Sequence, residues 1–337
     1  SAASDVYKRQ VFGFLAHPQL TEEQPDAPTN FGSLDQQAAL RWVQRNIAFF
    51  GGDPGNVTIA GQSAGGGSVM SQMACMDNEG LFHRAVVMSA MIRSPYQVGG
   101  IGVPEELWHA EENGQHFLSF LGCSTIEQAR KLDAVTIRDK YEEYTKIFPA
   151  MFTVLDHKFC VGDPMVLFME GKHVNVPVMS GNTSDEFPSY IEASSKEDLK
   201  KKAEEIFGKN AETFLRFPEA MQEDSDGKYA KVNGIECTIK CLFSEKKSAG
   251  EKKPYYYYRF DPDIPGWDNA GTFHSVDLWF FFETLAKCWR PFVGQHYDLS
   301  RMMCNYWVNF IKTGDPNGND ADGKPMPYWY PYEKEKP

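Results

Sequence analysis

The chain has 337 residues, of which 42% are hydrophobic and 14% aromatic, a composition that supports a sizeable core and is far from that of a disordered protein. Aspartate and glutamate (46) outnumber lysine and arginine (34), and the net charge of −12 argues against nucleic acid and anionic membrane surfaces as partners. No stretch approaches 18 consecutive apolar residues, so we expect no membrane span.

The cysteines are odd in number, scattered, and without a Cys-x-x-Cys pair: Cys75, Cys123, Cys160, Cys237, Cys241, Cys288 and Cys304. In a chain of this length such a set favours free, mostly buried thiols over a disulfide framework or a zinc site, although one pair such as Cys237 and Cys241 could be oxidised. We expect a reducing, cytoplasmic location and no cofactor or metal.

Residues 1–10 contain no initiating Met and no apolar signal segment, and we expect them to be a non-native addition. Val11–Leu15 then predicts a buried strand and Pro18–Asn30 a loop. Ser33–Phe50 predicts a helix that Ser33 caps and that ends at Gly51. One face of this helix carries Ala39, Leu40, Val43, Ile47 and Phe50.

The next segments alternate as in a doubly wound parallel sheet: a strand over Val57–Ala60, a helix to about Cys75, and a strand over Arg84–Ser89. Further strands are predicted over Val174–Ser180 and Pro254–Phe260. The remaining helices are predicted over Pro104–Lys146, Lys196–Ile206, Asp226–Lys246, Val276–Leu285 and Leu299–Thr313. We interpret about 190–250 as a helical insertion or lid within one domain.

The most informative motif is Gly61-Gln62-Ser63-Ala64-Gly65, which follows a β-branched strand and opens a helix. In that position Gly-x-Ser-x-Gly predicts a nucleophile elbow, with the serine hydroxyl at a helix N-terminus where developing negative charge is favoured. The alternative is a glycine-rich turn that only packs a helix on a sheet. A phosphate loop is excluded because no Gly-Lys-Ser/Thr follows, and a dinucleotide fingerprint because Ser63 replaces its second glycine.

A serine nucleophile needs a base, which in α/β-hydrolases comes last in the chain order serine, acid, histidine. Of the eight histidines, only His274 and His296 lie late enough and leave room for an acid before them. His274 follows a strand and a Pro/Gly/Asp-rich loop, as the order requires, whereas we expect His296 to face solvent at the start of the last helix. For the acid, Asp185 and Glu186 both follow a predicted strand, and the residues alone leave the choice open.

Several ordered segments together resemble the type-B carboxylesterases, an α/β-hydrolase family that also contains the cholinesterases: 30–36, 50–54, 56–59, 61–66, 181–186, the His274 loop and 307–317. The resemblance covers roughly 11–332. It implies an α/β-hydrolase fold with a mostly parallel central sheet flanked by helices, so that 11–337 is a catalytic domain of this family.

The resemblance also implies a catalytic triad of Ser63, Glu186 and His274, because the family uses the second acidic residue of the Asp-Glu pair. The sequence departs from the family at Phe187 and Ser275, where glycine is usual, and this affects loop shape more than chemistry. The implied mechanism is attack of the serine on an ester carbonyl, transfer of its proton through the histidine to the leaving alkoxide, and hydrolysis of the acyl-enzyme by water.

The backbone N–H of Ala64, directly after the nucleophile, is one expected oxyanion donor. In the family the other donors come from a His-Gly-Gly loop in an N-terminal segment, and the sequence contains no such motif. We therefore expect the chain to be a partial domain that lacks the N-terminal strands. On this interpretation the native N-terminus, where an export signal would lie, is missing. A secreted protein is therefore the alternative to a cytoplasmic one.

Gln62, Phe187 and Phe281 are candidates for substrate contact, with a core position as the main alternative for the aromatic residues. Gln62 carries no negative charge to attract a choline-like cation. We therefore predict a serine carboxylesterase for small to medium uncharged esters, with a small-molecule substrate and an undetermined oligomeric state. The alternatives are a catalytically silent binding module of the same fold, and a serine peptidase or thioesterase.

Overall fold

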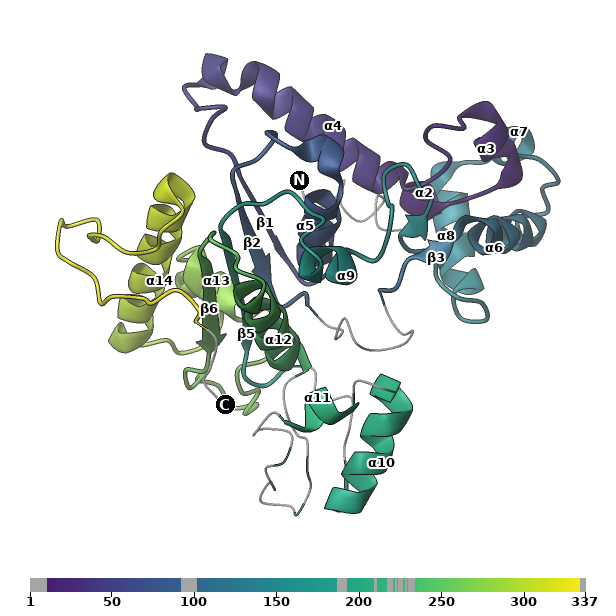
Figure 1. The fold of residues 1–337 in the computed structure, drawn as a ribbon. Coiled ribbons are helices and arrows are strands. Elements are labelled where there is room, and N and C mark those ends of the chain that lie inside the picture. The colour runs from purple at the N-terminus through teal and green to yellow at the C-terminus, as the bar shows by residue number, and fades with distance from the viewer. Residues whose placement is uncertain are drawn as a thin grey trace.

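A parallel sheet of four strands organises the computed structural model of the protein, which describes residues 11–91, 102–186, 193–208, 211–216, 221, 223, 227, 229 and 234–333. The strands lie in the order β1–β2–β5–β6 (Figure 1) and comprise β1 (Thr58–Gln62), β2 (Arg84–Met88), β5 (Val178–Thr183) and β6 (Tyr255–Phe260). The predicted parallel α/β sheet is confirmed. The third strand starts later than expected, at Val178, directly after Pro177, which has no N–H for the ladder.

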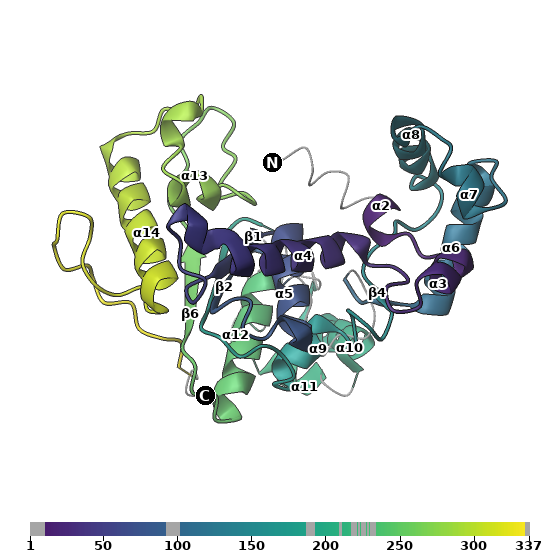
Figure 2. The same ribbon diagram turned by 90° about the horizontal axis from the view of Figure 1, so that it is seen from above.

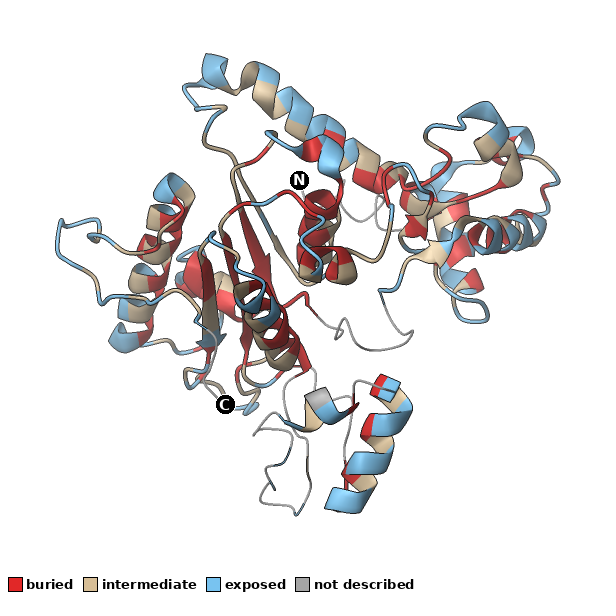
Figure 3. Cartoon of the chain, viewed as in Figure 1, coloured by how far each residue is buried: buried red, intermediate tan, exposed pale blue. Residues whose placement is uncertain are grey.

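Helices cover both faces of this sheet because its side chains alternate in direction. Ala85 and Val87 of β2 are fully buried in one apolar core, while Val86 and Met88 are buried in the other. The first core is closed by α5 (Ala64–Ala74), α9 (Pro164–Met169) and α12 (Gly234–Ser248). The second is closed by α13 (Asp277–Phe281) and α14 (Gly294–Thr313). Figure 3 shows burial concentrated on the strands and on the helix faces that meet them.

A second group of helices stands apart from the sheet (Figure 1) and has apolar clusters of its own. It contains α2 (Val11–Phe14), α3 (Pro18–Glu23), α6 (Leu107–Phe120), α7 (Ile126–Ala129) and α8 (Ala134–Tyr144), beside the short parallel pair β3 (Glu105–Glu106) and β4 (Val154–Leu155). The predicted strand at Val11–Leu15 is therefore wrong, since a short apolar run cannot separate a strand from a buried helix turn. Part of the expected loop is also helical, because Pro18 stands at the first position of α3 and His17 caps it.

The long helix α4 (Phe31–Asn46) crosses the molecule between the two groups (Figure 2) and continues as η1 (Ile47–Phe50). Its N-cap is Asn30, in the left-handed region at φ 56°, not Ser33. Its buried residues are Gly32, Ser33 and Gln37, whereas the expected apolar face ends in an exposed Phe50. Polar contacts with α5, such as Gln72 Nε2 to the carbonyl of Ser33 (2.8 Å), hold the helix in place.

The segment expected to be an insertion divides in two. Helices α10 (Lys196–Phe207) and α11 (Ala211–Leu215) form a small cluster of their own below the sheet in Figure 1. By contrast α12 lies on the sheet, where Ile239 and Leu242 are fully buried. None of the seven cysteines, all of which lie in the described residues, forms a disulfide. No helix within the described ranges is long and apolar enough to cross a membrane.

Candidate active site

Ser63 occupies a strained turn between β1 and α5. Its backbone has φ 56° and ψ −125°, a region that residues with a side chain rarely adopt, and its N–H donates to the carbonyl of Met88 on β2 (2.9 Å). The residue is the N-cap of α5 at the carboxyl end of the sheet, where unpaired helix N–H groups favour negative charge. The structure thus has the strand, strained turn and helix that a nucleophile elbow requires.

Two glycines make this turn possible. A Cβ on Gly61 would lie 2.2 Å from the carbonyl oxygen of Gly65, and one on Gly66 would lie 2.3 Å from Ala90 Cβ. Real Cβ atoms do not approach so closely, so neither position accepts a larger residue without moving the backbone. Close packing of the strand, the turn and the helix therefore explains the glycines that flank Ser63.

The structure brings Glu186 onto His274, as the resemblance implied. The Glu186 side chain is fully buried in the loop after β5, its Oε2 is hydrogen-bonded to His274 Nδ1, and its Oε1 accepts from the N–H of Thr183 (2.9 Å). The imidazole is 27% exposed, so one edge of it reaches solvent. A buried carboxylate on Nδ1 fixes the orientation of the ring.

Asp185, the other candidate acid, has a different task. Its carboxylate accepts from the N–H (2.8 Å) and the hydroxyl (2.9 Å) of Thr272, and these bonds hold the pKa of Asp185 below its ordinary value. Thr272 lies two positions before His274 in the same loop. Asp185 therefore fastens the loop, and Glu186 orients the ring.

A second buried carboxylate lies behind this pair, and the sequence interpretation missed it. Asp277, at the start of α13, is fully buried, and its Oδ2 accepts from the hydroxyl of Tyr258 (2.9 Å). Burial raises the pKa of Asp277 to about 6, and the neighbouring charge of Glu186 acts in the same direction. The sequence feature that could have indicated this buried carboxylate is the position of Asp277, an acidic residue inside the apolar run after His274.

Gln62 contacts His274, the candidate base. Its Nε2 lies 3.1 Å from His274 Nε2, so the amide donates to the imidazole nitrogen that would serve as the base. This hydrogen bond requires Nε2 to be unprotonated and the proton to be on Nδ1, facing Glu186. The hydrogen bonds described for the imidazole lead to Glu186 and Gln62, and none of them joins it to the Ser63 hydroxyl.

The remaining residues that the sequence analysis singled out lie in different surroundings. Phe281 is only 4% exposed and stacks on Trp307 (4.7 Å between ring centroids), so it lies in the core and not beside Ser63. His296 is buried, not solvent-facing, because its ring closes the start of α14 by accepting from the N–H of Val293 (3.0 Å). Phe187 lies outside the described residues. Ser275 has φ 75°, a conformation that favours the glycine usual in the family.

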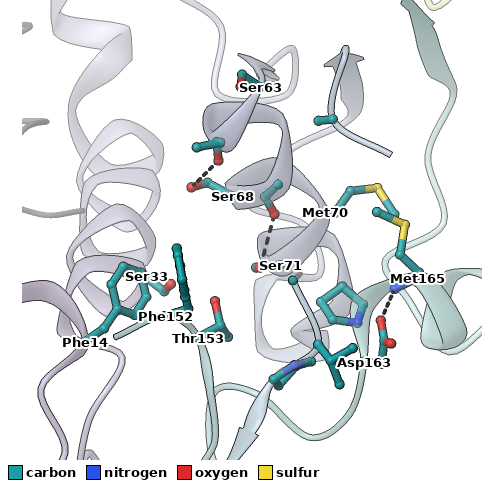
Figure 4. A pocket seen from close by; sticks show the side chains of 17 residues that line it. Phe14, Ser33, Ser63, Ser68, Met70, Ser71, Phe152, Thr153, Asp163 and Met165 are labelled. Carbon is teal, nitrogen blue, oxygen red and sulfur yellow. Dashed lines mark hydrogen bonds between the residues drawn. The ribbon is translucent and has the colours of Figure 1, made fainter. Parts of the chain in front are cut away.

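A pocket of about 310 Å³ opens beside Ser63 and runs along α5 (Figure 4). Its walls carry large apolar side chains, among them Phe14, Met70, Phe152 and Met165. Ala64, whose N–H as the first helical residue lies outside the hydrogen bonds of α5, is at the same end as Ser63. The site thus combines a serine in a strained strand-to-helix turn, an imidazole bonded to a buried carboxylate, and an apolar pocket beside the serine.

Comparison with known proteins gives consistent matches. The sequence pattern of the carboxylesterase family matches residues 6–233 and 231–337. The para-nitrobenzyl esterase of Bacillus subtilis (strain 168) is 30% identical, with 92% of this chain and 64% of the relative covered. The bile salt-activated lipase of Rattus norvegicus is 28% identical over 91% of this chain and 55% of the relative.

Solved structures agree with the sequence matches. A PNB esterase superposes with a TM-score of 0.70 at 26% identity, covering 96% of this chain and 65% of that structure. The fold is that of the α/β-hydrolases. The chain spans about three fifths of the length of the curated relatives it matches.

Proposed function

Because this chain belongs to the carboxylesterase family, we propose that it hydrolyses carboxylic esters through an acyl-enzyme formed on Ser63. In this proposal His274 is the general base and Glu186 orients it. The observation that carries the proposal is the hydrogen bond of the buried Glu186 to His274, whose other ring nitrogen contacts Gln62, the residue next to the strained serine. This arrangement supports the proposal because Gln62, which contacts His274, is the residue directly before Ser63.

The first half of the reaction forms the acyl-enzyme. The Gln62 amide releases His274 Nε2, and Ser63 Oγ attacks the ester carbonyl carbon while its proton passes to Nε2. The carbonyl oxygen takes up the negative charge beside the Ala64 N–H and the N-terminus of α5. The carbon–oxygen bond to the alcohol then breaks, and the Nε2 proton passes to the leaving alkoxide.

The second half repeats these steps with water. His274 Nε2 removes a proton from water, the hydroxide attacks the acyl carbon, and the proton returns to Ser63 Oγ as the acid leaves. Glu186 stays ionised throughout and stabilises the imidazolium in both halves. No group other than the residues of this chain is needed to balance the protons.

The pocket supports uncharged substrates. Among its described lining residues only Asp163 is acidic and none is basic, and the Asp163 carboxylate accepts from the N–H of Met165 (2.9 Å) as the N-cap of α9. Because this carboxylate already accepts a hydrogen bond at the helix N-terminus, it is poorly placed to bind a cationic substrate. The names of the relatives favour ester hydrolysis over the peptidase and thioesterase alternatives, and the hydrogen-bonded Glu186–His274 pair argues against a silent binding module.

The test compares 4-nitrophenyl butyrate with the matched anilide and thioester, using the wild-type chain, Ser63→Ala and Ser119→Ala. Ser119 is a matched control because its hydroxyl bonds only within α6, to the carbonyl of Gln115 (3.0 Å). We expect the ester to be the best substrate, with turnover lower by about 10³-fold or more in Ser63→Ala and unchanged in Ser119→Ala. Equal turnover by all three proteins, or preference for the anilide or thioester, would contradict the proposal.

A further inference from the structure

A second pocket lies in the group of helices that stands apart from the sheet (Figure 1). It has a volume of about 380 Å³ and shares no lining residue with the pocket beside Ser63. We propose that this second pocket binds the anion of a medium-chain fatty acid, with the hydrocarbon chain inside and the carboxylate at Arg130. The inference concerns a site other than the proposed active site and does not rest on the proposed function.

The walls of the second pocket come from two apolar clusters. One cluster includes Phe117 and Ile137, and the other includes Leu118 and Ile126, all of them buried. Three further side chains pack against both clusters, line the pocket and are only partly buried: Leu15, Leu121 and Leu132. A hydrocarbon chain between the clusters would remove this apolar surface from water, which is favourable.

The volume of the pocket suits a chain of about ten carbons. Pockets that bind small molecules usually have about 300–1,000 Å³, and one water molecule takes about 30 Å³ in the liquid. At that volume for each non-hydrogen atom, about 380 Å³ holds about twelve atoms, the number in decanoate. Decanoate is therefore the probe of choice.

Arg130 supplies the charge that selects an anion. It is the only charged residue in the described lining, where the other side chains are apolar. Its guanidinium donates from Nη1 (2.9 Å) and Nη2 (2.6 Å) to the carboxylate of Glu23, which lies outside the lining. A guanidinium has five N–H donors, so a ligand carboxylate can accept from those that Glu23 leaves.

The ion pair of Arg130 with Glu23 is weak enough for a ligand to share or displace it. The two side chains are 56% and 46% exposed, and ion pairs so open to solvent contribute little to stability. Glu23 nevertheless repels a ligand carboxylate by like charge. Removal of the charge of Glu23 should therefore tighten binding, and removal of the charge of Arg130 should weaken it.

Isothermal titration calorimetry with decanoate measures both changes. We expect saturable binding to the wild-type chain, an affinity about fivefold or more lower in Arg130→Met, and an affinity about two- to fivefold higher in Glu23→Gln. Arg301→Met is the matched control, because Arg301 forms an exposed ion pair with Glu283 (2.8 Å) outside the lining, and it should leave the affinity unchanged. Octan-1-ol, an uncharged chain, should bind all four proteins equally.

Methyl NMR locates the bound chain. Ile126 and Ile137 line the second pocket, whereas Met70 and Met165 line the pocket beside Ser63. We expect decanoate to shift the δ1-methyl signals of both isoleucines, assigned with Ile126→Val and Ile137→Val. These shifts should saturate at concentrations below those that move the methyl signals of the two methionines.

A substitution at the rim of the pocket should block binding. Ala134 lines the pocket and is exposed at the start of α8, so Ala134→Phe adds a ring there without rearranging the core. We expect this variant to lose the isoleucine shifts. Val135→Phe is the matched control, since Val135 is also exposed and lies outside the lining, and it should bind decanoate as the wild-type chain does.

Three results would each overturn the inference. They are shifts confined to Met70 and Met165, isoleucine shifts that grow without saturation, and an affinity that Arg130→Met and Glu23→Gln leave unchanged. Every readout is a binding measurement without turnover, so failure of the proposed esterase function would leave this inference standing.

Discussion

The proposed nucleophile, Ser63, and the proposed acid–base pair, His274 and Glu186, are held in place by different physical means. On the nucleophile side, Ser63 is fixed by backbone strain at φ 56° and by glycines that allow backbone segments to touch. On the acid–base side, the partly exposed His274 is fixed by its hydrogen bond to the buried Glu186, and Asp185 bonds to the loop that carries His274. The position of Ser63 therefore depends on close backbone packing, and the position of His274 depends on hydrogen bonds to carboxylates.

This difference predicts different responses to change. A side chain added on the nucleophile side should damage the fold itself, because no space exists for it. A charge removed on the acid–base side should damage the chemistry or its pH dependence first, because an isosteric amide preserves the packing. The predictions below test this contrast in order of expected effect.

The largest effect on stability is expected for Gly61→Ala. Its Cβ would lie 2.2 Å from the backbone oxygen of Gly65, so the turn has to open, at a cost of about 4 kcal/mol or more in the free energy of unfolding. Gly67→Ala, in open space on helix α5, should instead be neutral or stabilise by up to about 1 kcal/mol. Chemical denaturation of both variants measures this, and equal stability would contradict the packing argument.

Glu186→Gln should leave the fold intact and lower turnover by about 10³–10⁴-fold, because an amide cannot stabilise the imidazolium and favours the wrong tautomer. The steady-state rate with 4-nitrophenyl butyrate measures the loss, and circular dichroism checks the fold. Asp185→Asn is the neighbouring comparison: it should weaken the loop contact with Thr272 and lower turnover much less. If Asp185→Asn were the more damaging change, the assignment of the acid would be reversed.

Asp277→Asn should alter the pH dependence of stability. The folded-state pKa of Asp277, about 6, lies above the ordinary value near 4, so the folded chain holds this proton more tightly and stability falls as pH rises from about 4 to 6. The asparagine variant lacks this loss, which amounts to about 3 kcal/mol, and Tyr258 can still donate to its amide oxygen. Unfolding followed from pH 4 to 7, with exposed Asp298→Asn as control, tests the sign; a parallel decline in all three proteins would contradict it.

The smallest effect is expected for Ser275→Gly. Ser275 sits at φ 75°, where glycine has no steric penalty, so the change should stabilise the chain by about 1 kcal/mol. Thermal unfolding detects this as a small rise in Tm. A fall in Tm would show that the serine side chain contributes more than the backbone strain costs.

The elements predicted correctly from the sequence are those that residues close together in the chain determine. The elbow, α5 and the strands β1, β2 and β6 follow from glycine spacing and from β-branched or aromatic runs. By contrast Val11–Phe14 is a helix because it packs against partners far along the chain, which periodicity over a few residues does not record. The face of α4 was misjudged for a similar reason, since its buried contacts are polar.

The site was predictable in part. Ser63 and His274 follow from motif and chain order, but Glu186 and Asp185 are neighbours, and only the three-dimensional path of the loop decides which of them meets the imidazole. Asp277 was missed because its partner Tyr258 comes from a different element. The pocket was missed because its walls gather from distant segments, with Gly67 giving only the weak signal of a third successive glycine.

The most direct test of the central claim, that Ser63 is an activated nucleophile, is labelling with a fluorophosphonate followed by mass spectrometry of the adduct. The account predicts one adduct on Ser63, absent in Ser63→Ala and formed much more slowly in Glu186→Gln. Folded wild-type protein that stays unlabelled, or that is labelled at another residue, would contradict it.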